Sequence, residues 1–275
     1  MILLDELYED YVKYVFKKTG LNYGVNKKYF VEKRIKNRMA DLNIEDFKEY
    51  YNLIRFSEDE SEFYKLVNDL TVNETYFFRD FPQFQNFAEE ILPIIIKDKQ
   101  KRGDYNLRIW SAACSTGEEP YTLAIILLEM LEEPEKWNIE IVASDINELV
   151  IEAAKVGIYD ERAVREVPPE YLYKYFTKIE DKYLINLKLR KSVKFKKLNL
   201  FDFEEMELMT NYDFIFCRNV LIYFNNRSRK MVVDSFYNSL NSGGFIFLGH
   251  SESIGRISAA YKAQKIGSII VYSKP

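Results

Sequence analysis

The chain has 275 residues, a formal net charge of −4 at pH 7 and 47% hydrophobic residues. This length suits one large domain or two smaller ones, and the composition can bury an ordinary core, so we expect a soluble globular protein. The acidic balance excludes a general attraction to nucleic acid or anionic membrane, and any charge-based recognition has to come from a local patch. The sequence shows neither a signal-peptide pattern nor a long apolar run, which predicts a cytosolic protein without direct membrane insertion.

The first 70 residues predict a small all-α domain. Apolar residues recur at three- and four-residue spacing from Leu4 to Val15, and Gly20 follows two lysines as a helix stop. Strand-like alternation is absent from this part of the sequence. Three further helical stretches are expected at about 26–40, 44–56 and 61–69.

From about residue 92, short β-rich runs alternate with helical segments. The strand-like runs are 107–112, 139–144, 212–218, 243–250 and 267–273. This alternation predicts a doubly wound α/β domain, which we place at 86–275, with a mostly parallel sheet covered on both faces. Residues 182–200 alternate apolar and basic side chains, which predicts a small antiparallel β insertion at about 175–198.

Polar side chains follow three of the predicted strands. Ligands of doubly wound sheets bind at the carboxyl ends of the strands, near the point where the strand order reverses. Here the loop 111–119 follows the first strand, Asp145 follows the second, and Arg218 and Asn219 follow a later one. Asp145 suits the two hydroxyls of a ribose.

The loop 111–119 is poor in glycine. A dinucleotide site uses several glycines so that backbone N–H groups can approach the pyrophosphate, whereas this loop has only Gly117. Glu118 and Glu119 would repel a phosphate but would suit a ligand with an ammonium group. S-adenosylmethionine has such a group and no phosphate. The alternative, that the two glutamates only complement a helix dipole, is equally open at this point.

Six sequence blocks, in a fixed order along the chain, indicate which kind of protein this is. They are "VNETYFFRD", "RIWSAACSTGEEPYTLA", "ASDINELVIEAAKVGIY", "NLFDF", "YDFIFCRNVLIYF" and "GGFIFLGHSESI". Together they closely resemble the CheR family of chemotaxis receptor methyltransferases, over nearly the whole chain. The resemblance implies a Rossmann-like methyltransferase domain behind an all-α domain. It also implies methyl transfer from S-adenosylmethionine to glutamate side chains on the cytoplasmic helices of chemoreceptors, with S-adenosylhomocysteine as the second product.

The resemblance also implies the site residues. Glu118 would pair with the α-ammonium, Asp145 would accept the ribose hydroxyls, and Arg79 would bind either the cofactor carboxylate or the substrate carboxylate. Arg79 and Tyr223 would be the catalytic residues, Tyr223 by orienting the reacting groups. Residues 71–85 would be a linker that contributes to the cofactor site. The full set of implied cofactor contacts is Asn73, Thr75, Arg79, Glu118, Asp145, Asn199, Leu200, Arg218 and Asn219.

The implied reaction does not require a general base, and the sequence has only one histidine that could serve as one. A glutamate side chain has a pKa of about 4.3, so near pH 7 it is already an ionised nucleophile and needs no general base. Catalysis of an in-line displacement can come mainly from positioning. The single histidine, His250, is therefore expected to be structural, and no metal is expected.

A basic face is the candidate receptor-docking surface. Lys27, Arg34 and Arg38 project from nearly the same side of a helix. Such a run is usually a solvated surface, but the resemblance implies docking against receptor helices. The acidic total and the missing nucleic-acid motifs disfavour nucleic acid.

The region 176–195 bears on how the protein is tethered. Some family members bind a receptor tail peptide through a three-stranded insertion with a glycine-bearing loop, whereas here the region is compact and has no glycine. We therefore expect no tail-peptide tether. A monomer is expected by default, and the resemblance implies a cytoplasmic enzyme that is recruited to membrane-bound receptor arrays. Two alternatives remain: an NAD-dependent dehydrogenase, which lacks its glycine fingerprint here, and a non-catalytic sensor or scaffold that binds S-adenosylmethionine or its product.

Overall fold

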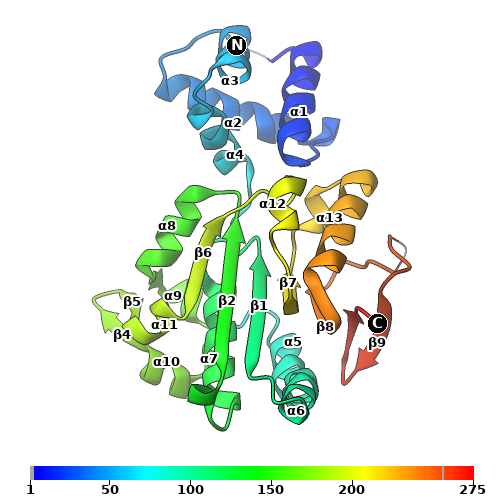
Figure 1. Ribbon diagram of the computed structural model, residues 1–275. Coiled ribbons are helices and arrows are strands. Elements are labelled where there is room, and N and C mark those ends of the chain that lie inside the picture. Colours follow the sequence, from blue (N-terminus) through cyan, green and yellow to red (C-terminus); the bar gives the residue numbers. More distant parts are fainter. Residues whose placement is uncertain (1–2, 256) are drawn as a thin grey trace.

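The computed structural model describes residues 3–255 and 257–275, and it shows a helical domain above a sheet domain (Figure 1). The predicted all-α domain is confirmed, and its helices bury Tyr11, Ile35, Tyr50 and Leu66 in a common core. Its elements are α1 (Asp5–Thr19), the 3₁₀ turn η1 (Val25–Lys27), α2 (Lys28–Asp41), α3 (Phe47–Phe56) and α4 (Ser61–Leu70).

The sheet domain is built on seven strands in the order β6-β2-β1-β7-β8-β10-β9. β10 runs antiparallel to β8 and β9, and the other pairs are parallel, so the predicted doubly wound α/β fold is confirmed. β1 lies between β2 and β7, which is where the strand order reverses. The strands are β1 (Asn106–Ala112), β2 (Asn138–Asp145), β6 (Val193–Lys197), β7 (Tyr212–Cys217), β8 (Leu240–Leu248), β9 (Lys262–Ile266) and β10 (Ile269–Ser273).

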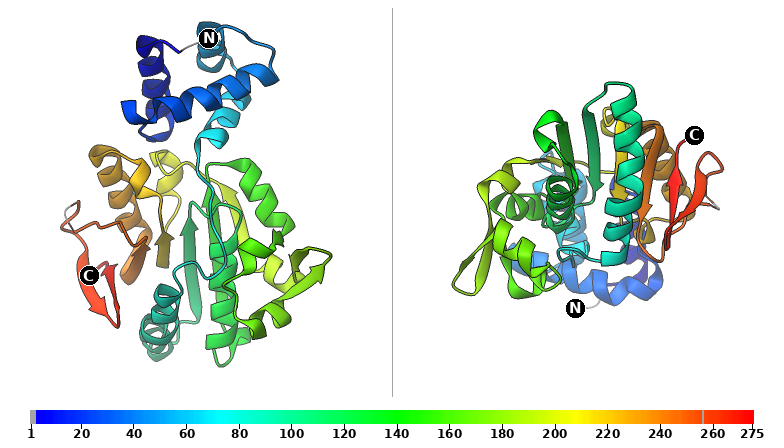
Figure 2. Two further views of the ribbon diagram at one scale, coloured as in Figure 1. Left: turned by 180° about the vertical axis from the view of Figure 1, so that it is seen from behind. Right: turned by 90° about the horizontal axis from the view of Figure 1, so that it is seen from below.

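Helices cover both faces of this sheet (Figure 2). Ile109 of β1 packs in the core with α5 (Phe81–Asn86), the π-helical turn η2 (Phe87–Ile91), α6 (Leu92–Lys101) and α7 (Glu118–Met130). The next residue, Trp110, packs in the opposite core with α12 (Phe203–Glu207) and α13 (Asn226–Ser239). Alternating residues of the strand therefore serve two cores, as expected of a sheet covered on both sides. The remaining helical segments are η3 (Pro134–Lys136), α8 (Glu148–Val156), α9 (Glu161–Val164), α10 (Pro169–Tyr175), α11 (Leu187–Lys191) and η4 (Leu221–Tyr223).

The small antiparallel sheet differs from the expected insertion at about 175–198. It consists of β3 (Ile158–Asp160), β5 (Lys182–Ile185) and β4 (Phe176–Ile179), in that order. Residues 193–197, which were expected to belong to the insertion, instead form β6, which pairs parallel to β2 with Val193 opposite Ile141. β6 is an edge strand of the main sheet, buried at Val193 and exposed at Lys194. An edge strand and an antiparallel insertion give the same alternation of apolar and polar residues, so the sequence pattern did not separate them.

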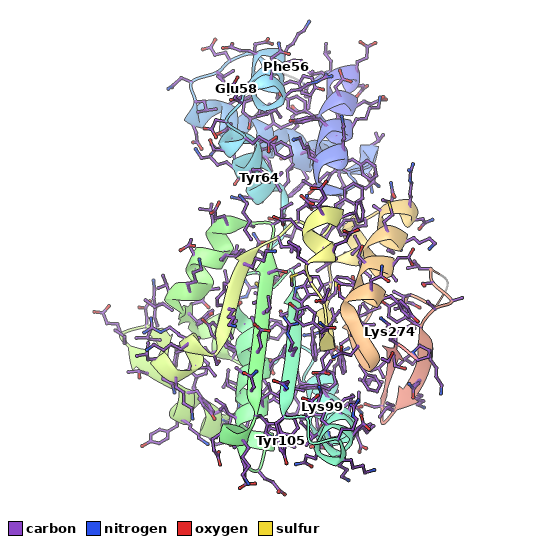
Figure 3. All side chains as sticks on the ribbon, in the orientation of Figure 1. Phe56, Glu58, Tyr64, Lys99, Tyr105 and Lys274 are labelled. Atoms are coloured by element: carbon purple, nitrogen blue, oxygen red, sulfur yellow. The ribbon has the colours of Figure 1, made fainter. Side chains whose placement is uncertain are left out.

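The two domains dock directly on each other. Leu21 forms an antiparallel β-bridge with Phe224, and the N–H of Asn22 donates to the Tyr223 carbonyl at 2.8 Å. On the sheet side, the Asn199 amide donates to the Lys18 carbonyl at 2.8 Å. Tyr64 lies on the side of the helical domain that faces the sheet domain (Figure 3), and Lys197 Nζ sits 4.2 Å from the centroid of its ring.

Gly20 makes this close approach possible. It ends α1 in the left-handed region with φ 72°, and its N–H donates to the Phe16 carbonyl. A Cβ at this position would lie 2.7 Å from the Phe201 ring and 2.8 Å from the Phe224 ring.

Among the described residues, no helix has the length and apolar character that crossing a membrane requires.

We predict that Gly20→Ala destabilises the protein more than Gly103→Ala does. Both glycines have positive φ, at 72° and 67°, but a Cβ added to Gly103 would have no atom within 4 Å. Gly103→Ala should therefore report backbone strain alone, about 1 kcal/mol, and Gly20→Ala should add about 1–3 kcal/mol of overpacking. Urea unfolding followed by circular dichroism measures both losses, and equal losses would contradict a tight contact at Gly20.

Candidate active site

A cavity of about 230 Å³ lies at the carboxyl ends of β1, β2 and β7, next to the helical domain. Figure 1 shows β1 and β2 pointing toward that domain. Tyr223 lines the cavity, together with eight of the nine expected cofactor contacts. These eight contacts are Asn73, Thr75, Arg79, Asp145, Asn199, Leu200, Arg218 and Asn219.

The linker supplies one wall of the cavity. Residues 71–76 line it, and this segment continues from α4 toward α5 along the sheet domain (Figure 2). The Asn73 carbonyl accepts a hydrogen bond from Ser115 Oγ at 3.0 Å, which ties the linker to the loop that follows β1.

The loop after β1 has an unusual backbone. Ala113, Ser115 and Gly117 all have positive φ, at 61°, 49° and 94°, although only one of them is glycine. Phe78, Asp80 and Asn219 also have positive φ, and each lies in or beside a cavity-lining segment. Such conformations cost about 1 kcal/mol or more each in a non-glycine residue and persist where the surrounding structure enforces them, typically at functional sites.

Asp145 enforces part of this backbone. It is 6% exposed, its Oδ2 accepts from the Ser115 N–H at 2.9 Å, and its Oδ1 accepts from the Asn147 N–H at 2.9 Å. Burial raises the pKa of this carboxyl, while the hydrogen bonds oppose the rise. Each carboxylate oxygen has a further lone pair, so Asp145 can still accept a hydrogen bond from a ligand in the cavity.

Glu118 does not line the cavity, contrary to its expected role at the ammonium group. It is 3% exposed, and its carboxylate accepts a hydrogen bond from Thr116 Oγ1 at 2.7 Å. Glu119 lines the cavity instead, accepting from Ser111 Oγ at 2.7 Å and from Arg218 Nη1 at 3.1 Å. Successive helix residues project about 100° apart, so the two adjacent glutamates point in different directions. The geometry therefore favours Glu119 over Glu118.

Arg218 is a buried cation at the cavity wall. Besides Glu119, it donates to the Arg79 carbonyl at 2.5 Å, and its Nη2 lies 3.7 Å from Asp80 Oδ2. Its Nε has no hydrogen-bond partner among the described residues. A buried charge of this kind is tolerated because carboxylates compensate it.

Arg79 and Tyr223 both reach the cavity, as expected for groups beside the reacting atoms. The Arg79 guanidinium donates to the Glu74 carbonyl at 2.8 Å. Burial raises the pKa of Tyr223, an effect that outweighs the opposing charge of Arg79. The Tyr223 hydroxyl therefore stays protonated near neutral pH and can act as a hydrogen-bond donor.

The side chain of Asn199 makes two hydrogen bonds within the protein. Its Nδ2 is committed to the Lys18 carbonyl, and its Oδ1 accepts from the Phe201 N–H at 3.0 Å. The side chain thus joins the two domains, whereas Leu200 offers an apolar contact to the cavity.

The helical domain contributes a wall that sequence reasoning missed. Thr19, Leu21, Tyr23 and Leu70 line the cavity. In the sequence these residues are ordinary helix ends and a short loop, so the local pattern carries no signal for a binding role. Only the docking of the two domains reveals it.

The basic face formed by Lys27, Arg34 and Arg38 is only partly free to bind a partner, because Arg38 is already paired within the protein. Arg38 forms a two-pronged ion pair with Glu62, at 2.9 and 2.8 Å, and also pairs with Asp41 at 2.8 Å. The charge pattern around α2 in the sequence does not include Glu62, because that residue comes from α4. Arg34 lies 5.2 Å from the centroid of the Phe30 ring, and Lys27 is exposed.

The sheet is mostly parallel, and a cavity at its strand-order reversal joins carboxylates, a cation and apolar walls. This arrangement is typical of an α/β domain that binds a nucleotide-type ligand. Comparison with known proteins identifies its kind. Residues 73–269 match the family model of the CheR methyltransferase SAM binding domain, and residues 6–71 match that of the CheR methyltransferase all-alpha domain. The chain therefore belongs to the CheR methyltransferase family, which confirms the resemblance seen in the sequence.

Three relatives illustrate the match. The chain is 40% identical over 263 residues to Chemotaxis protein methyltransferase 2 of Vibrio cholerae, covering 95% of this chain and 90% of that protein. It is 35% identical over 245 residues to the Chemotaxis protein methyltransferase of Borreliella burgdorferi, with coverages of 88% and 86%. The Escherichia coli protein of the same name is 32% identical over 252 residues, with coverages of 90% and 84%.

The burial of Glu118 predicts a pH-dependent stability. Desolvation raises its pKa from 4.5 to about 7, so the folded protein binds this proton more tightly than the unfolded chain does. The stabilisation is complete below about pH 4.5 and is lost as the pH rises through about 7. Relative to Glu118→Gln, which does not titrate, the unmodified protein should lose up to about 3 kcal/mol between pH 5 and 8. Urea unfolding of both proteins across this range measures the difference, and a constant difference would contradict the raised pKa.

Proposed function

We propose that this protein transfers a methyl group from S-adenosylmethionine to glutamate side chains of chemoreceptors, forming glutamyl methyl esters. The observation that carries the proposal is the cavity that gathers Asp145, Glu119, Arg79 and Tyr223 between the two matched family domains. The relatives named chemotaxis protein methyltransferase support the receptor substrate.

The cavity fits the proposed cofactor group by group. Asp145 would accept hydrogen bonds from the ribose hydroxyls, and Leu200 and Ile146 would pack against the adenine. Glu119 would face the α-ammonium. Arg79 supplies a cation for a carboxylate, of either cofactor or substrate. When bound, the cofactor supplies an electrophilic methyl group on a sulfonium.

The residues of the chain then act by orientation. A receptor glutamate is ionised near pH 7 and attacks without a general base. Tyr223, protonated near neutral pH like any tyrosine, would donate a hydrogen bond that orients the reacting groups. The helical domain would help to exclude water from the cavity. Positioning of this kind can supply much of the acceleration of a displacement reaction.

The receptor would dock on the helical domain. Lys27 and Arg34 remain the best candidates for contact with acidic receptor helices, because Arg38 is already paired. The β4–β5 hairpin turns through Glu180 and Asp181 alone, which supports docking without a receptor tail peptide. The protein would act as a cytoplasmic monomer recruited to receptor arrays, with no role for nucleic acid.

The test of this function is a methylation assay with radiolabelled S-adenosylmethionine and receptor cytoplasmic fragments from the same organism. We expect label on the receptor that base releases as methanol, the signature of a glutamyl ester. Asp145→Asn should lower the rate at least about 100-fold through lost cofactor binding and a misplaced loop, whereas Asp181→Asn in the exposed hairpin turn should not change it. Cofactor binding without methylation of a competent receptor would instead support the sensor or scaffold alternative.

Charge reversal tests the docking face. Lys27→Glu should raise the KM for the receptor about 5-fold or more and leave kcat unchanged, because it removes attraction remote from the reacting atoms. Lys101→Glu, at the exposed end of α6, is the matched control and should leave KM unchanged. An equal effect of both variants would show a general response to net charge rather than a docking face.

A further inference from the structure

We propose that Glu252 is a positioning residue that fixes the active-site loop after β7. The inference rests on the proposed function for its catalytic consequence. The Glu252 carboxylate accepts hydrogen bonds from four backbone N–H groups. Oε1 accepts from Val220 at 2.9 Å and Leu221 at 2.7 Å, and Oε2 accepts from Asn219 at 2.8 Å and Gly249 at 2.7 Å.

Three of these donors are consecutive residues of the loop. β7 ends at Cys217, so the sheet no longer provides partners for the N–H groups that follow. Asn219 has φ 60°, which turns the chain so that neighbouring N–H groups converge on one carboxylate. Without Glu252, these partly buried donors would lose their partner in the protein, which is unfavourable for the loop conformation.

The same loop forms much of the cavity wall. Asn219, Val220, Ile222, Tyr223 and Phe224 line the cavity, whereas Glu252 does not. Glu252 therefore does not contact a ligand in the cavity. It acts on the site mainly through the backbone that it holds, and its charge adds to the rise in the pKa of Tyr223. Because Leu21 bridges to Phe224, the loop held by Glu252 is also the one on which the helical domain docks.

The segment that carries Glu252 is itself fixed. The Leu248 carbonyl, at the end of β8, accepts a hydrogen bond from Gln83 Nε2 at 2.8 Å. On the other side, Ser253 Oγ and the Tyr272 hydroxyl are 2.9 Å apart, and Ile254 is fully buried. The carboxylate is thus held between two anchored points.

Gly249 gives Glu252 room to reach the loop. A Cβ on Gly249 would lie 2.8 Å from both the Asn219 nitrogen and Glu252 Oε2. Any larger residue would push the carboxylate and the loop apart. Gly249→Ala therefore disturbs the same contact while keeping the carboxylate.

Glutamine is a poor substitute at this position. Its single carbonyl oxygen can accept from two donors, but its NH₂ group would face the other two N–H groups. Glu252→Gln keeps the shape of the side chain and breaks half of the contact, so it is the variant of choice.

The experiment measures kcat, KM and the affinity for S-adenosylhomocysteine, on protein shown to be folded by circular dichroism. We expect Glu252→Gln and Gly249→Ala each to lower kcat about 10- to 100-fold, because small displacements of positioning groups slow the reaction strongly. KM for the receptor should stay within about 3-fold, since the docking face is remote. Glu132→Gln, which removes an exposed carboxylate after α7, is the control and should match the unmodified enzyme.

The outcomes separate this inference from the proposed function. Variants that unfold at lower temperature but keep the full kcat when folded would show a merely structural Glu252 and overturn the proposal. If the unmodified protein methylates no receptor, the proposed function fails. The positioning role of Glu252 is then tested by the affinity for S-adenosylhomocysteine, measured by calorimetry. A loss of about 10-fold in Glu252→Gln would then support the positioning role, and an unchanged affinity would overturn it.

Discussion

The active site depends on the docking of the end of α1 against the loop after β7. Gly20 lets the chain approach the Phe201 and Phe224 rings, and Leu21 and Asn22 then bond to the backbone of Phe224 and Tyr223. This contact brings Thr19, Leu21 and Tyr23 to a cavity that the sheet domain alone would leave open on one side. The helical domain is therefore a structural part of the candidate active site as well as the proposed surface for the receptor.

Two carboxylates, the buried Asp145 and the partly buried Glu252, stabilise the loops of this site. Asp145 holds the loop after β1 through the N–H of Ser115, and Glu252 holds the loop after β7 through three consecutive N–H groups. A dinucleotide site relies on glycines to bring the backbone toward a phosphate. Here alanine, serine and asparagine take left-handed conformations. Asp145 and Glu252 accept the N–H groups of Ser115 and Asn219, and these hydrogen bonds help to compensate for the strain. A loop organised by acids is also electrostatically suited to a cationic ligand.

Some charged side chains of the cavity pair with each other and stabilise the structure, while another is available to a ligand. Glu119 and Asp80 compensate the buried Arg218, while Arg79 keeps its guanidinium at the cavity with a backbone carbonyl as its partner. Tyr223 is protonated near neutral pH, as an ordinary tyrosine is, and burial raises its pKa further. None of these groups has to move a proton for a carboxylate nucleophile to attack, so the arrangement suits a reaction that depends on alignment.

The sequence by itself determined the two-domain plan, the doubly wound sheet and most of the residues at the cavity. Periodicity and the polar residues at strand ends are local signals, and six ordered blocks are specific to one family. The sequence did not determine that Glu119 rather than Glu118 lines the cavity, that β6 joins the main sheet, that Glu62 neutralises Arg38, or that Asn199 and Glu252 bind backbone groups far away in the chain. Those facts depend on the rotation of a helix and on contacts between residues distant in sequence. Only the tertiary structure decided them, because such contacts form when separate elements pack together, and no local pattern encodes which partners they bring within hydrogen-bond distance.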